Sequence, residues 1–368
     1  MRGFIRISTN FSSAGRTCRD RPVKRMKIIF LRRDNIGDLI CTTPAIRATR
    51  EAHPHAKIGV LVNTYNADAI MNNPDVDEIY VYEKTKHSPD KNKLSVSLRN
   101  VRVFQKIRKE RYDVGIGCGS YSRTLERHTF LTGAKMRIGY RKNPSLNFLY
   151  NNPVLQSSSE EHEVVKTFNL LKSLEIGGQP GDLVLFPDRL EREKFKTFKK
   201  SRIKNAMPLL AIAISARIQK HKWPLEKFTT LIKRILHTGG ANILLLWAPG
   251  SKDSPAFPGD EESAAHIIRN ANSELLLPYP TPALKSLIAA LSLSDVVVTL
   301  DTGSLHLSAA LKKPTVALMT KKNTSLWHPW RTKSVVVTAE NRVEEISVES
   351  VLEATDTLMK DFCNNARC

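Results

Sequence analysis

Residues 295–319, with the sequence DVVVTLDTGSLHLSAALKKPTVALM, contain the pattern that decides the fold. The β-branched run at 296–299 is typical of a buried strand, and small polar residues follow it. A helical pattern then extends to Leu311, and a second apolar run begins directly after Pro314. A strand, a helix and another strand in this order predict two parallel strands of one α/β sheet.

The turn after the first of these strands opens a helix, where backbone N–H groups and the helix dipole can bind a phosphate. The hydroxyls of Thr302 and Ser304 and the imidazole of His306 can add donors, while Asp301 can orient the turn. Gly303 would let a ligand approach the backbone closely. The same residues also fit an ordinary strand-to-helix turn with a packed histidine, so this stretch alone leaves both interpretations open.

The same alternation of apolar runs and helical patterns extends over most of the chain. In the first half it predicts strands at 27–31, 57–62, 78–81 and 112–117. In the second half it predicts strands at 209–214, 242–247, 295–300 and 315–319. We therefore expect an α/β protein with two Rossmann-like, doubly wound domains that face a central cleft, where ligands of such folds bind.

The segments between these strands suggest the domain limits. Helical patterns occupy 45–51 and 161–174, and a stretch rich in Lys, Ser and Asn at 84–98 predicts a loop before a helical segment. Dense Gly and Pro residues near 177–187 mark a boundary. We predict a basic, disordered leader at 1–25, an N-terminal domain at 26–178, a C-terminal domain at 179–342, and a C-terminal helix and tail at 343–368 that could pack on either domain.

The formal charge of +21 over 368 residues indicates an anionic partner: nucleic acid, a phosphorylated substrate or an anionic membrane surface. Residues 1–25 carry six Arg and one Lys against one Asp, and they lack the apolar segment of a secretory signal. They are either a disordered basic leader, or they come from an upstream start codon and the true first residue is Met26. Their composition also fits a transit peptide. No run approaches the roughly 20 apolar residues that span a bilayer, and the five cysteines are scattered. We expect a soluble, cytoplasmic protein with reduced thiols.

A second candidate cluster follows the first strand, in the sequence RRDNIGDLICTTP at residues 32–44. Gly37 permits a tight loop, and Thr43 before Pro44 suits the start of a helix. Asp38 would then lie at the mouth of the cleft, where a carboxylate can act as a general base. The alternative is that this carboxylate only binds the first backbone amides of the helix.

A third cluster, SARIQKHKWP at residues 215–224, follows the first strand of the second domain. The hydroxyl of Ser215 with Lys220 or Lys222 suits a phosphate, and a lysine can neutralise charge on a leaving diphosphate. The alternative is a solvated basic loop. The Asp-Val-Asp sequence at 75–77 suits a turn rather than a metal site, and GIGCG at 115–119 lacks the full dinucleotide fingerprint, so we expect no metal and no cofactor.

The three clusters, in this order and spacing, resemble glycosyltransferase family 9, the heptosyltransferases. The matching segments are the IGD and TTP motifs within 36–44, NNPDVD at 72–77, KWP at 222–224, DTGSLHLSAAL at 301–311 and WHP at 327–329. The resemblance implies a GT-B fold whose N-terminal domain binds the acceptor and whose C-terminal domain binds a nucleotide diphosphate sugar. It also implies ADP-L-glycero-D-manno-heptose as the donor and a lipopolysaccharide core, lipid A-Kdo or already heptosylated, as the acceptor.

The resemblance further implies roles for individual residues. Asp38 matches the catalytic base, and we assign Gly37 and Thr42 of the same motif to acceptor binding. The residues that match the donor site are Ser215, Lys220, Asp301, Thr302, Gly303 and His306. Lys222 is equally eligible because this sequence has an additional basic residue beside KWP. The acidic ribose contact of the family has no clear match in WAPGS at 247–251.

Other functions compete with this interpretation. A GT-B transferase for another nucleotide sugar, or an epimerase of the same fold, would use similar motifs. The basic charge also suits a non-enzymatic nucleic-acid-binding protein, but aromatic residues make up only 7% and are not interleaved with basic ones. We therefore expect an inverting glycosyltransferase with no nucleic-acid partner. Its charge would attract an anionic lipid-linked oligosaccharide at the inner face of the inner membrane.

Overall fold

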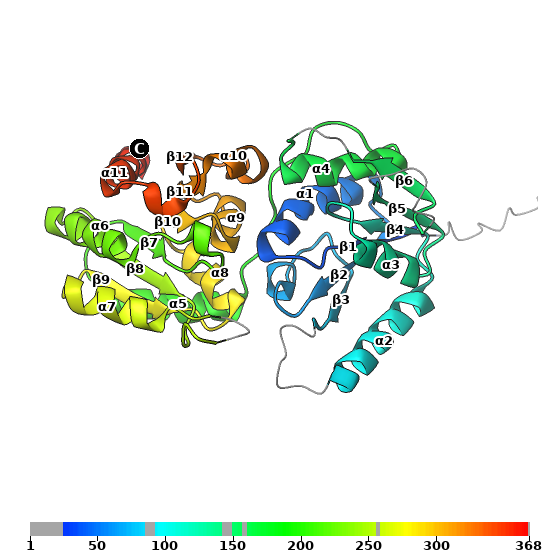
Figure 1. The fold of residues 1–368 in the computed structure, drawn as a ribbon, viewed down its shortest axis with the longest axis horizontal. Helices are drawn as coiled ribbons and strands as arrows, with labels where there is room; N and C mark the ends of the chain where they lie inside the picture. Colours follow the sequence, from blue (N-terminus) through cyan, green and yellow to red (C-terminus); the bar gives the residue numbers. More distant parts are fainter. Residues whose placement is uncertain (1–24, 85–92, 142–148, 157–159, 255–257, 367–368) are drawn as a thin grey trace, which may run out of the picture.

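The computed structural model describes residues 25–84, 93–141, 149–156, 160–254 and 258–366. Their strands form two six-stranded sheets, one from each half of the chain (Figure 1). The leader that we predicted at 1–25 lies outside the described residues, apart from Arg25. Within the described ranges, no helix has the length and apolar character needed to cross a membrane.

The first sheet is entirely parallel and has the strand order β3-β2-β1-β4-β5-β6. Its strands are β1 (Lys27–Leu31), β2 (Lys57–Asn63), β3 (Glu78–Tyr82), β4 (Val114–Gly117), β5 (Met136–Arg141) and β6 (Asn152–Leu155). Its helices are α1 (Ile36–Ala52), α2 (Lys93–Glu110), α3 (Arg123–Leu131) and α4 (Glu163–Asn169), with the 3-10 helices η1 (Ala67–Ala69) and η3 (Leu170–Leu174). The strand order reverses between β1 and β4, which opens a crevice at the carboxyl ends of these strands.

The second sheet repeats this topology, with the order β12-β11-β10-β7-β8-β9. Its strands are β7 (Leu209–Ala213), β8 (Asn242–Trp247), β9 (Leu276–Pro280), β10 (Val296–Leu300), β11 (Thr315–Thr320) and β12 (Ser334–Ala339). Its helices are α5 (Arg189–Arg202), α6 (Leu225–Thr238), α7 (Glu261–Ala271), α8 (Leu284–Ser292), α9 (Gly303–Ala310), α10 (Lys321–Trp327) and α11 (Val348–Ala366), with η4 (Gln219–His221) and η5 (Val343–Glu345). The prediction of two doubly wound α/β units is confirmed.

Strand β10 shows why the pattern at 295–319 is decisive. All five of its residues are buried, because helices cover both faces of the sheet. Val298 pairs with Ile212 of β7 on one side and with Val316 of β11 on the other. A strand that is apolar on both faces and has parallel neighbours on both sides must lie in the centre of the sheet.

The helix after β1 begins earlier than we predicted. It starts at Ile36, so Pro44 lies inside the helix and not at its first position. A proline has no N–H and leaves the carbonyl four residues earlier without its helical donor. The Thr43 hydroxyl donates to this carbonyl, that of Ile40, at 2.7 Å. Oγ1 of Thr43 in turn accepts the backbone N–H of Val184, 2.9 Å away, from the segment that joins the two sheets.

The loop predicted at 84–98 is wrong in its second half, because α2 already begins at Lys93. Residues 85–92 of that prediction lie outside the described residues. Val96 and Ile107 of α2 are buried, whereas most of its other residues are polar or charged. This narrow buried face explains why the composition of the stretch resembled that of a loop.

The C-terminal helical pattern packs on the second sheet. It begins with η5 and continues, after a short break, as α11. Val343, Val351 and Leu358 are buried in the same apolar cluster as β7, β8 and β10. The sequence left open which domain this segment packs on. Its apolar face packs on the second.

The first turns of α1 and α9 join the two units, and these helices face each other between the sheets (Figure 1). A Cβ atom on Gly37 would overlap the imidazole of His306. A Cβ atom on Gly303 would lie 3.1 Å from Cβ of Ile36. Neither glycine has a positive φ, so both are required for space and not for backbone conformation. One apolar cluster continues from the first unit into the second across this contact.

We expect Gly37→Ala to reduce the free energy of unfolding by roughly 1–3 kcal/mol, as overpacking of a filled interior does. The better helix propensity of alanine would offset about 0.5–1 kcal/mol of this loss. Gly177→Ala is the matched control, because its Cβ would meet no atom within 4 Å. Urea unfolding measures both variants, and equal stability of the two would contradict the packing described for Gly37.

Candidate active site

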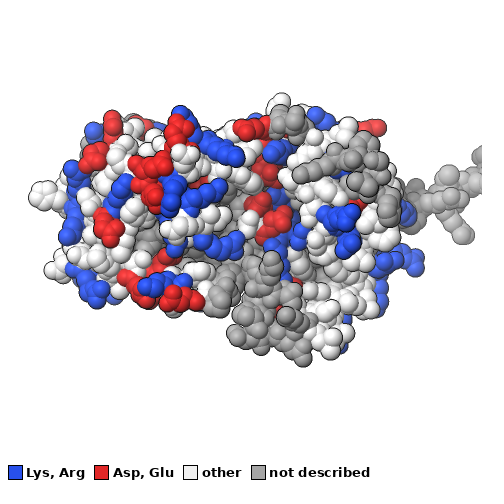
Figure 2. Space-filling model, viewed as in Figure 1, with Lys and Arg blue, Asp and Glu red and all other residues white. Residues whose placement is uncertain are grey.

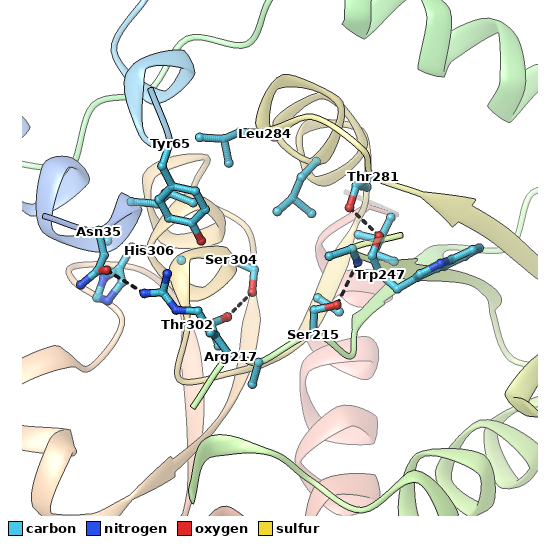
Figure 3. A pocket seen from close by; sticks show the side chains of 18 of the residues that line it. Asn35, Tyr65, Ser215, Arg217, Trp247, Thr281, Leu284, Thr302, Ser304 and His306 are labelled. Atoms are coloured by element: carbon cyan, nitrogen blue, oxygen red, sulfur yellow. Dashed lines mark hydrogen bonds between the residues drawn. The ribbon is translucent and has the colours of Figure 1, made fainter. Parts of the chain in front are cut away.

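A cavity of about 960 Å³ lies between the two sheets at the carboxyl ends of their strands (Figure 3). The first unit contributes residues 35–38 and Tyr65, and the second contributes the loop after β7 and the turn after β10. The structure thus brings together the three clusters that the sequence singled out. The predicted site residues that line the cavity are Gly37, Asp38, Ser215, Asp301, Thr302, Gly303 and His306.

Asp38 both caps α1 and lines the cavity, so its capping role does not remove it from the site. Its Oδ2 accepts hydrogen bonds from the backbone N–H of Asn35, at 3.0 Å, and from Asn35 Nδ2, at 2.9 Å. Its Oδ1 accepts one from Nη2 of Arg32, at 2.6 Å. Burial raises the pKa of Asp38, but Arg32 and Asn35 together outweigh burial and hold this pKa below its ordinary value. The carboxylate is therefore ionised at neutral pH.

Arg32, at the end of β1, is a buried cation shared by two carboxylates. Its Nη2 also donates to Oε1 of Glu163, the first residue of α4, at 2.7 Å. Burial lowers the pKa of Arg32, but Glu163, Asp38 and Asp34 raise it further, so the net shift is upward. Nε and Nη1 of Arg32 have no hydrogen-bond partner among the residues that the structure describes. This guanidinium fixes the position of Asp38 and keeps it charged.

Arg217 extends from the second unit across the cavity to the first. Its Nη2 donates to Oδ1 of Asn35 at 3.1 Å, and its guanidinium lies 5.6 Å from the ring centroid of Tyr65 (Figure 3). Asn35 thus connects Arg217 to Asp38. The sequence predicted no role for Arg217, Asn35 or Tyr65, although Arg217 lies in the third cluster and Asn35 in the second. Only the tertiary fold shows that they meet.

The turn after β10 is held by its neighbours. Oδ2 of Asp301 accepts from Nδ2 of Asn323 at 2.6 Å, and the Asp301 carbonyl accepts from Nδ1 of His221 at 2.9 Å. Oγ of Ser304 lies 2.8 Å from Oγ1 of Thr302, inside the turn. The first backbone N–H groups of α9 begin here, where a helix has no internal acceptors for them. The turn can therefore bind an anion in the cavity.

His306 is buried at the contact between the two units and lines the cavity. Its imidazole is packed between Gly37 and Trp327, and its Nδ1 is 3.6 Å from Sγ of Cys41. Burial lowers the pKa of His306, with Asp301 and Asp38 opposing the shift. The packed histidine that the sequence left open is thus present, at the edge of the cavity.

The two lysines of the third cluster do not line the cavity. Lys220 lies exposed in η4, and Lys222 lines a neighbouring cavity of about 330 Å³. Ser215 does line the main cavity, and its Oγ accepts the backbone N–H of Ala248 at 2.9 Å. The cation that this loop places at the main cavity is therefore Arg217.

Thr42 is also placed away from the cavity. Its side chain is fully buried, and its hydroxyl donates to the backbone carbonyl of Asp38 at 2.9 Å. This bond supports the first turns of α1, one turn below the carboxylate. Direct contact of Thr42 with an acceptor would require α1 to move.

One end of the cavity is mainly apolar. Leu246, Pro282, Leu284 and Leu287 line it, and Asp260 lies at its border. Burial raises the pKa of Asp260, while Ser215 and Lys222 lower it less strongly. An apolar slot next to one carboxylate suits a flat ring attached to a sugar with hydroxyl groups. Among the described residues, no three His, Cys, Asp or Glu side chains are grouped so that they could hold a metal ion.

The chain matches a known protein family. The model of glycosyltransferase family 9 (heptosyltransferase) matches residues 100–355, more than half of the chain. The chain belongs to this family. It is 23% identical over 323 residues to lipopolysaccharide heptosyltransferase 2 of Escherichia coli K12, covering 85% of this chain and 88% of that protein. The chain is therefore a glycosyltransferase, as we predicted.

Solved structures of the family have the same GT-B fold. A family 9 glycosyltransferase from Veillonella parvula superposes with a TM-score of 0.79 at 18% identity, covering 91% of this chain and 97% of that one. The E. coli heptosyltransferase WaaC with ADP superposes with a TM-score of 0.72 at 18% identity, covering 90% and 100%. The predicted architecture of this glycosyltransferase is confirmed.

We expect Arg32→Gln to lower the free energy of unfolding by about 3–5 kcal/mol at neutral pH, because two buried carboxylates lose their cation. The pKa of Asp38 is held below the ordinary 3.8, so its stabilisation is complete above that pH and is lost as the pH falls through the lower folded-state value. The difference from wild type should therefore shrink below about pH 4.

Urea unfolding at several pH values measures this difference. Arg234→Gln, which removes an exposed ion pair with Glu349, is the control and should change stability little at any pH. A difference for Arg32→Gln that stayed constant from neutral to acidic pH would show that its charge does not stabilise the carboxylates.

Proposed function

We propose that this glycosyltransferase transfers heptose from ADP-L-glycero-D-manno-heptose to a lipopolysaccharide core acceptor, with inversion at the sugar carbon. The observation that carries the proposal is that Asp38 of the first unit and the turn after β10 of the second unit line one cavity. A base and an anion-binding helix start beside one cavity suit attack on a sugar that is bound there. The names of the relatives, a lipopolysaccharide heptosyltransferase and a heptosyltransferase with ADP, support the choice of substrates.

We place the donor along the wall of the second unit. The apolar slot near Leu284 would take the adenine, and Asp260 would accept hydrogen bonds from ribose hydroxyls. The diphosphate would bind the first amides of α9 and the hydroxyl of Thr302. Arg217 lines the cavity and is the cation best placed to bind it, whereas a role for Lys220 would require η4 to move inward.

In the reaction, an acceptor hydroxyl attacks the anomeric carbon and gives its proton to Asp38. The new C–O bond forms as the bond to the diphosphate breaks, and the electron pair leaves with the phosphate oxygen. Arg217 and the start of α9 stabilise the charge that develops there. Because the pKa of Asp38 is held low, the carboxylate is a weak base and accepts the proton only once bond formation has acidified the hydroxyl.

Assays of ADP-, UDP- and GDP-activated sugars with lipid A-Kdo and heptosylated acceptors test the substrates. We expect transfer only from the ADP-heptose, with release of ADP that depends on the acceptor. Transfer from a UDP- or GDP-sugar would overturn the donor. Conversion of the sugar nucleotide without any acceptor would instead reveal an epimerase.

We expect Asp38→Asn to lower turnover at least about 100-fold, the usual loss when a general base is removed. The amide keeps the size of the side chain, and circular dichroism would check that the variant remains folded. Asp68→Asn is the matched control, because Asp68 also lines the cavity from the first unit but lies on η1. Near-normal turnover of folded Asp38→Asn, or an equal loss in the control, would remove Asp38 from this role.

A further inference from the structure

Helix α2 has apolar side chains on the side that faces solvent. Leu94, Leu98 and Val101 are 69%, 55% and 50% exposed. At 3.6 residues per turn, these three positions fall on one line along the N-terminal half of the helix. The opposite side holds Val96 and Ile107, which are both buried, and Ile107 packs in an apolar cluster with strands of the first sheet. The helix thus has two apolar faces, and one of them points outward.

Basic side chains accompany this outer apolar line. The helix carries six Lys or Arg residues and a single Glu, at its last position. Arg102 lies beside the end of the line, and Arg108 and Lys109 continue on the same outer side toward the C-terminus of the helix; all three are exposed. On the face shown in Figure 2, basic and acidic residues alternate over much of the second unit, whereas the six basic residues of α2 are accompanied by one acid.

Helix α2 is linked to the turn that precedes α1. Asn100 of α2 exchanges two hydrogen bonds of 2.9 Å with the backbone of Glu83. The next residue, Lys84, donates to the carbonyl of Asp34 at 3.4 Å, in the turn that leads into α1 and Asp38. The inner side of α2 is therefore connected, through residues 83 and 84, to the turn that carries Asp38.

We propose that α2 docks this protein on an anionic membrane surface, with its outer apolar line inserted between lipid headgroups. A helix that lies in the interface needs apolar residues along one line and cations beside it, which is the arrangement of α2. A nucleic acid would use the cations but not exposed leucines. A second copy of this chain would bring the same cations against each other, so charge repulsion disfavours it.

This inference extends the proposed function, because docking through α2 would hold the acceptor side of the cleft at the membrane. A lipid-linked acceptor would then reach Asp38 without leaving the bilayer. The test below needs neither donor nor acceptor. Its failure would thus leave the proposed transfer reaction intact, and failure of the transfer assay would leave the docking intact.

Co-sedimentation of the full chain with lipid vesicles tests the docking. We expect binding to vesicles that contain phosphatidylglycerol and little binding to phosphatidylcholine alone. The double variant Leu98→Gln/Val101→Gln should bind at least about tenfold more weakly, because two inserted side chains become polar. Both positions are exposed and helical, so the variant should keep its circular dichroism spectrum.

Leu190→Gln is the matched control, because Leu190 is 73% exposed on α5, which is also rich in Lys and Arg. It should bind vesicles as wild type does. No binding of the wild type, unchanged binding of the double variant, or an equal loss in the control would each overturn the proposal. Two further results would overturn it. One is a wild-type dimer in analytical ultracentrifugation that the double variant does not form, and the other is wild-type binding of RNA that the double variant loses.

Discussion

The contact between the first turns of α1 and α9 is the constraint on which the rest of the molecule depends. Gly37 lies against His306, and Gly303 lies against Ile36, so two helix starts from different sheets approach as closely as their backbones allow. Each helix follows the central strand of its own sheet. Because of this approach, a carboxylate on one helix and the first amides of the other line the same cavity. Larger side chains at the contact would separate Asp38 from the start of α9.

The charge around Asp38 depends on a buried ion-pair group of the first unit. Arg32 binds Asp38 and Glu163 at once, and it thereby connects β1, α1 and α4. Arginine suits this place because it stays protonated and offers several donors in one plane. Two carboxylates and one guanidinium leave a net negative charge beside the cavity. Arg217 from the second unit approaches this negative group through Asn35.

The sequence predicted the fold well because buried parallel strands are apolar on both faces, and β10 is a clear example. Most of the predicted site residues also line the cavity, since loops after central strands meet at one edge of a sheet. The sequence failed where the position of a residue depends on contacts that its pattern does not show. Pro44 appeared to start a helix, because the bond between Thr43 and the Ile40 carbonyl has no signature in the sequence. Likewise, nothing in the third cluster shows that Arg217 faces the cavity while Lys220 points to solvent.

The bond between Val184 and Thr43 has a mechanical consequence. The connecting segment is bonded to α1 at Val184. Two residues later, the carbonyl of Phe186 accepts a hydrogen bond from Nδ2 of Asn72, in the first unit, at 3.5 Å. From Arg189 onward the chain belongs to α5, where Glu191 accepts a hydrogen bond from Ser286 of α8 in the second unit. Because α11 packs on the second sheet, the described chain passes between the units only here. Pro187 and Asp188 join the stretch bonded to the first unit to the helix packed on the second, and the proline ring fixes one backbone torsion of this short connection.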